Sequence, residues 1–502
     1  METPGRLPTR TKIVATIGPA SESPEMLRRL ILAGVSVMRF NFSHGTLAEH
    51  ERRLRDVRAI AAEMARPVAV LGDLPGPKIR VGVVPEGGVE VVSGQEIIFE
   101  RGREMAAIVD GAPTFGVTYP ELIGEVEPGQ RVLINDGAIR LLAVDHDGQR
   151  LRCLVTIGGL ITSGKGINLP ETSVAVPSLT ERDWELTRWA VAHGVDYLAL
   201  SFVRRAEDIT LLRGRIADYA CNIGGGQTPI VAKIEKPQAV GNIEAITDAA
   251  DALMVARGDL GVEMDIAQVP LAQKRIIRAC EDWGKPCIVA TQMLESMITS
   301  AAPTRAEATD VANAIFDGAD AVMLSGETAI GRHPDLVVET MHRIARAAEG
   351  SGLIKSDEPS PPVQLVASRY QTAALAHGAW HVARDTAAAM VVCWSQHGGT
   401  ARYLSQNGFA VPIVAYTSDE ASSRRMALLR GVTPVLMRPP ASGLLGDWTD
   451  EVERDLLGRG WVRSGDVVVM LAGKPLGRAR ATNSIAVLRI GDPNSGYRAH
   501  QS

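Results

Sequence analysis

The chain carries near its centre the segment Ile230-Val-Ala-Lys-Ile-Glu-Lys-Pro237, then Ile243-Glu-Ala-Ile-Thr-Asp-Ala-Ala250, then Leu253-Met-Val-Ala-Arg-Gly-Asp-Leu-Gly261. The pattern predicts a strand, a helix and a second strand. Both strands are short apolar runs that end in charged residues, which is typical of a strand buried on both faces with its tip at a solvent-filled cleft. Lys233 and Glu235 lie two residues apart and therefore project to one side of the first strand, and Arg257 and Asp259 repeat this spacing on the second.

These charged residues predict a metal site. Adjacent parallel strands lie about 4.8 Å apart, so Glu235 and Asp259 can share one hard divalent cation, which prefers carboxylate oxygen and keeps positions for substrate phosphate. Lys233 then stands beside the metal as a fixed positive charge, and together with Arg257 it favours a phosphorylated or carboxylated substrate. A cluster of surface ion pairs at the strand ends is the alternative explanation.

Composition narrows the class of protein. A chain of 502 residues is too long for one hydrophobic core and predicts two to four domains. The net charge of −5, with no basic block, argues against a nucleic-acid partner. Residues 1–12 lack the apolar core of a signal peptide, and no apolar run is long enough to span a membrane. The five cysteines show no C-x-x-C spacing, so we expect reduced thiols and a cytoplasmic location.

Strand and helix patterns alternate through most of the first 350 residues. Eight strands are expected, two in the central segments and the others at 11–18, 35–44, 68–74, 197–203, 286–293 and 321–326. Eight β units predict a closed (β/α)₈ TIM barrel, whose reactive residues sit at the carboxyl ends of the strands. The polar side chains at those ends are Arg39, Asn41, Ser43, Asp73, Ser201, Lys233, Glu235, Asp259, Thr291, Ser325 and Glu327. A random scatter would not select one end of eight strands, which favours a functional site.

The alternation breaks at Pro75-Gly76-Pro77. From residue 81 to residue 169, short β runs are separated by Ser-Gly, Pro-Gly and Asp-Gly turns, so we expect an inserted small β-barrel domain that can act as a lid. After a linker at 350–362, four more strands with helices between them predict a second α/β layer fold. The expected division is a barrel at 1–74 and 176–350, a β lid at 75–175, and a C-terminal α/β domain for regulation or assembly at 351–502.

A loop in the third domain carries a weak signal for phosphate binding. It follows the first strand of that domain, precedes a helical stretch, and consists of Ser395, Gln396, His397, Gly398, Gly399 and Thr400. Small residues at such a turn can bind phosphate through backbone N–H groups, although plain turns use the same residues. The loop at 473–480 adds three cations near the last strand. A phosphorylated effector and an ordinary turn both remain open.

Several motifs, taken in order, resemble the pyruvate kinase family over almost the whole chain. They are TKIVATIGPAS at 11–21, MRFNFSHG at 38–45, Lys233 to Glu235 with ARGD at 256–259, ATQMLESM at 290–297, PTRAE at 303–307, DVAN at 310–313 and MLSGET at 323–328. One tetrapeptide would be weak, but this many in order are specific. The resemblance implies Mg²⁺-dependent phosphoryl transfer from phosphoenolpyruvate to ADP, the final step of glycolysis, giving pyruvate and ATP in a homotetramer.

The resemblance also implies roles for single residues. Glu235 and Asp259 would hold Mg²⁺, with Mn²⁺ as an alternative metal, and Lys233 would stabilise charge on the transferred phosphoryl group. The remaining implied contacts are Gly258 and Thr291 beside the substrate carboxylate, Arg39 on the phosphate, and Asn41, His44, Arg80 and Arg182 with the nucleotide. For His44, a hydrogen bond within its own loop is an equal alternative.

The leaving enolate needs a proton. A water relayed through Thr291, Ser325 and Glu327 is one hypothesis for the source. Simple anchoring of the substrate carboxylate by Thr291 is the other.

One departure from the family pattern concerns a monovalent cation. Many members bind K⁺ through the positions of Asn41, Ser43, Asp73 and a threonine, with a glutamate nearby. Here the threonine position is Leu74, which has no side-chain oxygen, and the glutamate position is Lys78, whose ammonium can replace the charge of K⁺. We therefore expect activity without K⁺.

Two other classes of protein are compatible with parts of the pattern. A metal-dependent barrel lyase acting on oxo-acids would share the paired carboxylates, but it has no reason for the lid or for Lys233. A non-catalytic metabolite sensor on the same scaffold would be expected to have lost Lys233, Glu235 or Asp259, and all three are present.

Overall fold

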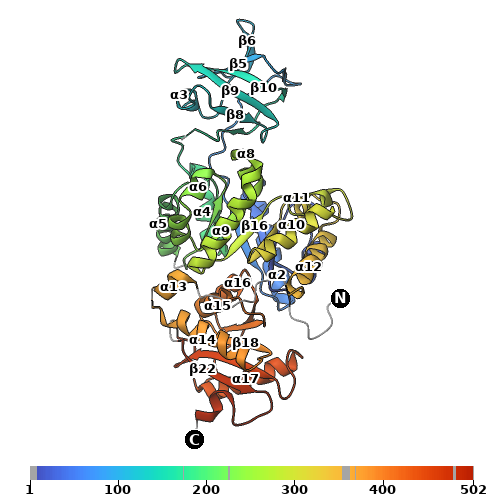
Figure 1. The fold of residues 1–502 in the computed structure, drawn as a ribbon, viewed down its shortest axis with the longest axis vertical. Coiled ribbons are helices and arrows are strands. Elements are labelled where there is room, and N and C mark those ends of the chain that lie inside the picture. Colours follow the sequence, from blue (N-terminus) through green and yellow to red (C-terminus); the bar gives the residue numbers. More distant parts are fainter. Residues whose placement is uncertain are drawn as a thin grey trace.

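The computed structural model has three parts along its long axis, with the lid at one end, the barrel in the middle and the C-terminal domain at the other end (Figure 1). The limits between them at residues 75, 176 and 351 stay predictions. The described residues are 8–172, 174–223, 226–352, 362–367, 369–478 and 482–500. Within these ranges, no helix is long and apolar enough to cross a membrane.

Eight parallel strands close into the predicted barrel, in the spatial order β1-β17-β16-β15-β14-β13-β3-β2. Their bounds are β1 Lys12–Thr16, β2 Val35–Asn41, β3 Ala69–Asp73, β13 Tyr197–Leu200, β14 Ile230–Ile234, β15 Ala252–Ala256, β16 Cys287–Ala290 and β17 Ala321–Leu324. Alternate residues such as Val14, Val231 and Met254 fill the interior, while their neighbours pack outward against the helices. The strands are therefore apolar on both faces, which made them recognisable in the sequence.

Helices surround the barrel, and several begin at caps visible in the sequence. Ser23 caps the first helix, and Thr46, Thr180 and Thr304 each form a capping box with an acidic residue three positions later. The helices are α1 Pro24–Ala33, α2 Leu47–Glu63, α4 Glu181–Ala192, α5 Ala206–Ile223, α6 Pro237–Gly241, α7 Ile243–Ala249, α8 Arg257–Glu263, α9 Val269–Trp283, α10 Arg305–Phe316, α11 Gly326–Ala329 and α12 Pro334–Gly350, with 3₁₀ turns η1 Ile266–Gln268 and η2 Glu295–Ile298.

The prediction that Arg257 and Asp259 lie on a strand is wrong. Strand β15 ends at Ala256, and both residues belong to the first turn of α8. Ala256 provides no side-chain cap for this helix, so the sequence contained no capping residue to indicate that a helix begins at Arg257.

The lid inserted between β3 and α4 is a β domain, as expected. Its seven-stranded sheet runs β12-β8-β9-β10-β5-β7-β6, beside the two-stranded pair β11-β4. The elements are β4 Val89–Val91, β5 Glu96–Glu100, β6 Ala107–Val109, β7 Ala112–Phe115, α3 Leu122–Glu125, β8 Arg131–Ile134, β9 Ile139–His146, β10 Arg150–Ile157, β11 Gly159–Ile161 and β12 Ile167–Asn168. The sequence pattern predicts strands at 89–92, 96–99, 131–134 and 151–157, which agree with β4, β5, β8 and β10 to within one residue, but it does not predict the shorter strands or β9. A core around Phe99, Phe115 and Leu151 holds the sheet together.

The C-terminal domain is a five-stranded sheet in the order β20-β19-β18-β21-β22, with apolar clusters on both faces. Its elements are α13 Val363–Ala367, α14 Gln371–Asp385, β18 Met390–Trp394, α15 Gly399–Ser405, β19 Ile413–Thr417, α16 Glu420–Met426, β20 Val432–Leu436, α17 Leu445–Gly458, β21 Val467–Gly473, β22 Thr482–Arg489 and η3 Gly496–His500. Four strands were predicted, and the antiparallel edge strand β22 was missed. Most of the predicted linker lies outside the described residues.

Candidate active site

Lys233 lies at the centre of a buried ionic cluster at the carboxyl ends of the barrel strands. Its Nζ is 2.8 Å from Oε1 of Glu235 and 3.2 Å from Oδ1 of Asp73, and it donates a hydrogen bond to Oγ of Ser201 (2.7 Å). Burial alone would lower the pKa of Lys233, but the Asp73 and Glu235 carboxylates outweigh burial and raise the pKa above its usual value. Lys233 is therefore a permanent cation, suited to stabilising negative charge and unsuited to accepting a proton.

Arg39 extends the cluster from β2. Its Nε and Nη2 both lie 2.7 Å from Oδ2 of Asp73, and its Nη1 donates to Oγ1 of Thr16 (3.0 Å). Burial would raise the pKa of Asp73, but Lys233 and Arg39 outweigh it and hold that pKa below its usual value. One carboxylate thus holds two cations, from β2 and β14, in fixed positions.

Glu235 and Asp259 are the pair predicted to hold a metal. Oε2 of Glu235 accepts a hydrogen bond from the backbone N–H of Phe202 (2.7 Å). Burial raises the pKa of Glu235, Lys233 opposes that rise, and the negative charge of Asp259 adds to it. The two carboxylates therefore repel each other at this site, and a bound cation would relieve that repulsion. Among the described residues no three His, Cys, Asp or Glu side chains are grouped for a metal, but Mg²⁺ is commonly held by one or two carboxylates plus water and substrate phosphate. The donor set fits that ion.

Thr291 lies beside these groups in a strained backbone. Its φ of 66° is rare for a β-branched residue, and such strain tends to occur at functional sites. Its Oγ1 accepts a hydrogen bond from the N–H of Gly258 (2.8 Å) and donates one to the carbonyl of Ala290 (2.7 Å). The predicted neighbours Gly258 and Thr291 are thus brought together at the start of α8.

The prediction that Arg257 lines the mouth of the site is wrong. Its side chain is buried, donates to the carbonyl oxygens of Thr291 and Gln292, and forms an ion pair with Asp310. Because Arg257 begins α8 instead of ending a strand, its guanidinium turns toward α10. The arginine of the cluster is Arg39.

Glu327 is fully buried behind the site. Its two oxygens accept hydrogen bonds from the N–H groups of Ser325 (2.6 Å) and Leu294 (3.1 Å). The Ser325 hydroxyl has no hydrogen-bond partner among the described residues. Glu327 therefore braces the loops after β16 and β17, and the proton relay through Thr291, Ser325 and Glu327 stays a prediction.

Apart from Asp73, the residues predicted near the nucleotide and the monovalent cation lie outside this ionic cluster. Oδ1 of Asn41 accepts from the N–H of Ser43 (3.1 Å), and the carbonyl of His44 contacts His50 (2.9 Å). Arg80 donates to the Gly164 carbonyl (2.8 Å), and exposed Arg182 pairs with Glu185.

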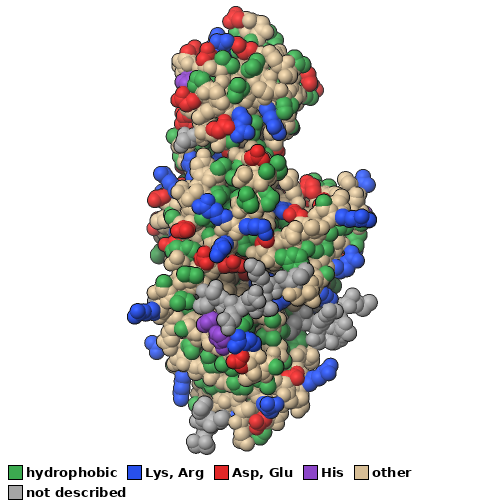
Figure 2. Space-filling model, viewed as in Figure 1, with side chains coloured by type: hydrophobic (Ala, Val, Ile, Leu, Met, Phe, Trp, Pro, Cys, Tyr) green, Lys and Arg blue, Asp and Glu red, His purple; other side chains and the backbone are tan. Residues whose placement is uncertain are grey.

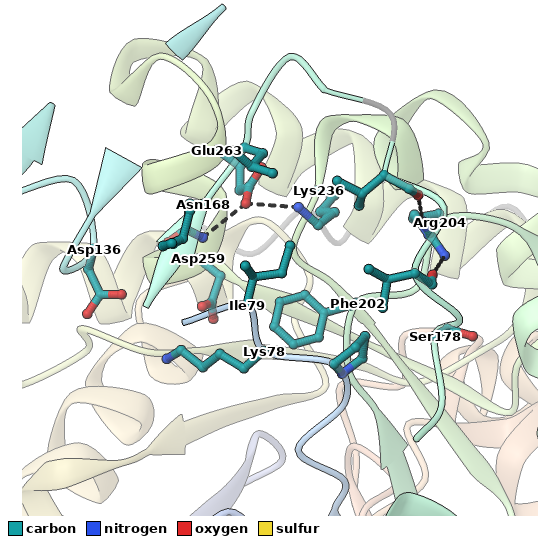
Figure 3. Close-up of a pocket in the computed structure, with 15 residues that line it drawn as sticks. Lys78, Ile79, Asp136, Asn168, Ser178, Phe202, Arg204, Lys236, Asp259 and Glu263 are labelled. Carbon is teal, nitrogen blue, oxygen red and sulfur yellow. Dashed lines mark hydrogen bonds and ion pairs between the residues drawn. The ribbon is translucent and has the colours of Figure 1, made fainter. Parts of the chain in front are cut away.

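The two departures from the family pattern differ in their surroundings. Leu74 is buried in the barrel core, and its carbonyl accepts a hydrogen bond from Ser201 (2.8 Å). Lys78 is exposed and lies between the barrel and lid residue Asp136 (Figure 3).

Sequence reasoning missed Asn168, Lys236 and Glu263, which line a cavity beside Asp259 where the lid meets the barrel (Figure 3). Lys236 directly follows Glu235, and Glu263 follows Asp259 by four residues, which is one turn of a helix. This spacing from the predicted metal ligands could have indicated both residues. Asn168 carried no signal, because its contact with Glu263 spans 95 residues.

The loop Ser395–Thr400 lines a cavity of about 330 Å³ in the C-terminal domain, together with Arg478 and Thr482. Helix α15 begins at Gly399 after Gly398, whose φ is 80°, and Oγ of Ser395 accepts from the N–H of Ala401 (3.1 Å). Thr400 and Thr482 hydroxyls are 2.7 Å apart. The predicted strand-to-helix turn is confirmed, and Arg480 lies outside the described residues.

The surface shows no single charged face in the view of Figure 2, where acidic and basic side chains are interspersed.

Comparison with known protein families identifies the family of this chain. A family model described as "Pyruvate kinase, barrel domain" matches residues 8–338, and one described as "Pyruvate kinase, alpha/beta domain" matches residues 373–488. The chain belongs to the pyruvate kinase family.

Curated pyruvate kinases from three bacteria illustrate the similarity. The chain is 40% identical to the Sporosarcina psychrophila protein over 96% of its own length and 81% of the relative. It is 41% identical to the Corynebacterium glutamicum protein and 40% to the Mycobacterium intracellulare protein, over 96% of its own length and 98% and 99% of theirs. Membership of the pyruvate kinase family makes the chain a phosphotransferase. The Lys233 cluster lies at the carboxyl ends of the strands in the matched barrel domain.

Proposed function

We propose that this member of the pyruvate kinase family transfers a phosphoryl group from phosphoenolpyruvate to ADP, the final step of glycolysis, and depends on Mg²⁺. The single observation that carries the proposal is the packing of Lys233 between Glu235 and Asp73, with Arg39 on the other side of Asp73. Two fixed cations thus face the space where two carboxylates can hold a metal. That arrangement suits a transfer in which negative charge spreads over phosphoryl oxygens.

The residues of the chain divide the work between positioning and charge stabilisation. Arg39 binds the phosphate of the substrate, and its bonds to Asp73 and Thr16 keep its guanidinium in place. Lys233 stabilises the phosphoryl group during transfer, because its raised pKa keeps it charged. Mg²⁺ held by Glu235 and Asp259, or Mn²⁺ in its place, would supply Lewis-acid stabilisation of the phosphoryl and enolate oxygens.

Thr291 and the backbone of Gly258 orient the carboxylate of the substrate. Their mutual hydrogen bond (2.8 Å) and the strained φ of Thr291 fix both groups before substrate arrives. Proton delivery to the enolate through Thr291 and Ser325 remains part of the proposal. Replacing Thr291 by Val while following pyruvate enolisation separately tests it, since unchanged proton exchange would remove the relay.

We also propose that K⁺ is not required. Asp73, at a position that binds K⁺ in many members of the family, is already paired with Arg39 and Lys233, and the side chain of Leu74 offers no oxygen. Lys78 adds a positive charge on the lid side of the cleft. The local charge that K⁺ would bring is therefore provided by side chains.

We also propose a regulatory site in the C-terminal domain. The cavity lined by Ser395, Thr400 and Arg478 suits a phosphorylated effector, because it adjoins the start of α15 and carries the positive charge of Arg478. A homotetramer and a cytoplasmic location follow from the family resemblance and stay predictions.

Incubation of the full-length protein with phosphoenolpyruvate, ADP and Mg²⁺ tests the proposed reaction. Equal amounts of ATP and pyruvate are expected, and both should disappear when Mg²⁺ is chelated. Release of pyruvate without ATP would contradict the proposal and favour a lyase or phosphatase.

A further inference from the structure

The lid meets the barrel around a small cavity of about 50 Å³, which has room for one or two water molecules. Lys236, Asp259 and Glu263 line it from the barrel, and Asp136 and Asn168 line it from the lid (Figure 3). The cavity therefore lies between the candidate metal site and the lid.

Glu263 joins the two sides of this cavity. Its Oε1 accepts a hydrogen bond from Nδ2 of Asn168 on lid strand β12 (3.0 Å) and lies 2.9 Å from Nζ of Lys236 on the barrel. The residue is 4% exposed, yet its Oε2 has no hydrogen-bond partner among the described residues. An unpartnered oxygen on a buried carboxylate costs free energy, which the two contacts made by Oε1 must offset.

The barrel partners in this contact adjoin the two carboxylates of the candidate metal site. Glu263 follows Asp259 by four residues on α8, so both side chains lie on one face of the helix. Lys236 directly follows Glu235. A displacement of Asn168 with the lid would therefore act on the helix that carries Asp259 and on the loop that follows β14.

A second contact limits how the lid can move. Nη1 and Nη2 of Arg204 donate to the carbonyls of Val174 and Val176, each at 2.5 Å. These bonds hold the segment through which the chain returns from the lid to the barrel. Asn168 is paired within the lid sheet, so we expect it to move with the lid, whereas Val174 and Val176 are attached to Arg204 of the barrel.

We propose that Glu263 is a positioning residue that couples the orientation of the lid to the placement of Asp259 on α8. The proposal rests on the function proposed above, in which Asp259 holds the metal. With the lid in the present orientation, Asn168 and Lys236 share Oε1 of Glu263. When the lid rotates away, only Lys236 remains on the carboxylate, and α8 is free to shift.

A distance measurement between lid and barrel tests the coupling. Cys221 is the one exposed cysteine of the five, so a spin label there on α5 and a second at Glu90→Cys on lid strand β4 report the lid orientation. The wild-type background should give one main distance. Asn168→Ala and Glu263→Gln, each made in that doubly labelled background, should both broaden the distribution.

Metal dependence provides the second readout. Glu263→Gln should raise the Mg²⁺ concentration for half-maximal activity about tenfold, because the bonds from Asn168 and Lys236 then go to a neutral acceptor and are weaker. Asn168→Ala lies on the lid and touches no predicted metal ligand, yet coupling requires it to shift Mg²⁺ dependence in the same direction. Titration with Mn²⁺ followed by electron paramagnetic resonance should show the same order without turnover.

Asp317→Asn is the matched control, because it removes another barrel ion pair, with Lys274, away from the lid. It should alter neither the distance distribution nor metal binding. Unchanged distances and metal affinity in both Asn168→Ala and Glu263→Gln would overturn the proposal. If Glu263→Gln fails to fold, the distances and the metal affinity of Asn168→Ala alone test the proposal. Failure of the proposed function would appear differently, as a wild-type protein that forms no ATP.

Discussion

The two ends of the barrel both bury charged side chains, but the charges have different partners. At the carboxyl end, Lys233, Arg39, Asp73 and Glu235 pair mainly with one another beside the candidate metal site. At the amino end, the buried charges also have partners in the C-terminal domain. They are Lys12 at the start of β1, Asp196 before β13 and Asp320 before β17.

The amino-end contacts connect two domains. Nζ of Lys12 donates to the carbonyl of Val432 (2.7 Å). Asp196 accepts from Nε of Arg424 (3.0 Å), and Asp320 accepts from Nε2 of Gln406 (3.1 Å). Val432, Arg424 and Gln406 all belong to the C-terminal domain, so these charges hold that domain against the barrel.

This difference separates a site for chemistry from a site for assembly. Charges that satisfy one another beside an opening can be redistributed when a substrate or metal arrives. Charges satisfied by another domain have no such freedom and contribute to stability, as expected for the bottom of a barrel of this type. Removing a charge should therefore affect activity at one end and stability at the other.

The largest expected effect is on activity at the carboxyl end. Lys233→Met should lower kcat about 10³-fold, because a preorganised cation that stabilises transition-state charge is lost. The matched variant Lys12→Met removes a buried lysine at the other end and should keep kcat near the wild-type value. Steady-state assays of both variants check this pair. A large loss of kcat in Lys12→Met would break the distinction between the two ends.

The next effect is on stability at the amino end. Asp196→Ala should lower the free energy of unfolding by about 3 kcal/mol, because Arg58 and Arg424 lose their shared buried partner. Thermal unfolding followed by calorimetry should show the loss, while kcat per folded molecule stays unchanged. Unchanged stability would mean that these ion pairs contribute nothing to docking of the C-terminal domain.

Asp320 predicts a pH dependence of stability. Burial raises the pKa of Asp320 to about 6, so the folded protein binds this proton more tightly than the unfolded chain. Stability from this group is full below about pH 4 and is lost as the pH rises through about 6. Asp320→Asn should remove that dependence and gain roughly 1–2 kcal/mol relative to wild type between pH 4.5 and 7.5.

Unfolding of both proteins in urea at the two pH values measures this difference. Asn keeps an acceptor for the Cys287 N–H, which bonds to Asp320 at 2.8 Å, and its amide N–H faces Gln406, whose carboxamide must turn to present its oxygen. A constant difference between the proteins at both pH values would show that Asp320 titrates as it does in the unfolded chain.

The smallest expected effect concerns K⁺ at the carboxyl end. Exchanging K⁺ for an inert organic cation at constant ionic strength should change kcat by at most about twofold, or roughly 0.4 kcal/mol. Asp73 already holds Arg39 and Lys233, so no charge is missing there. A strong activation by K⁺ would show that the side chains do not replace the ion.

The sequence predicted the barrel because each strand is apolar on both faces, and it predicted the Lys233 cluster because strand ends of a barrel converge. It did not predict that Arg257 turns away from the site, since Ala256 gives no capping signal for α8. The amino-end charges were also missed. Their partners lie 86 to 420 residues away in another domain, and no local sequence pattern predicts such a contact. The contact between Glu263 and Asn168 was not predicted for the same reason, because the two residues are 95 positions apart in the sequence.

The central claim is that Glu235 and Asp259 hold one metal beside Lys233. Titration with Mn²⁺ followed by electron paramagnetic resonance tests it directly in wild type, Glu235→Gln, Asp259→Asn and Lys233→Met. We expect one tight site per chain in wild type, its loss in both carboxylate variants, and its retention in Lys233→Met, where the cation beside the metal is removed. Undiminished Mn²⁺ binding in Glu235→Gln or Asp259→Asn would contradict the account.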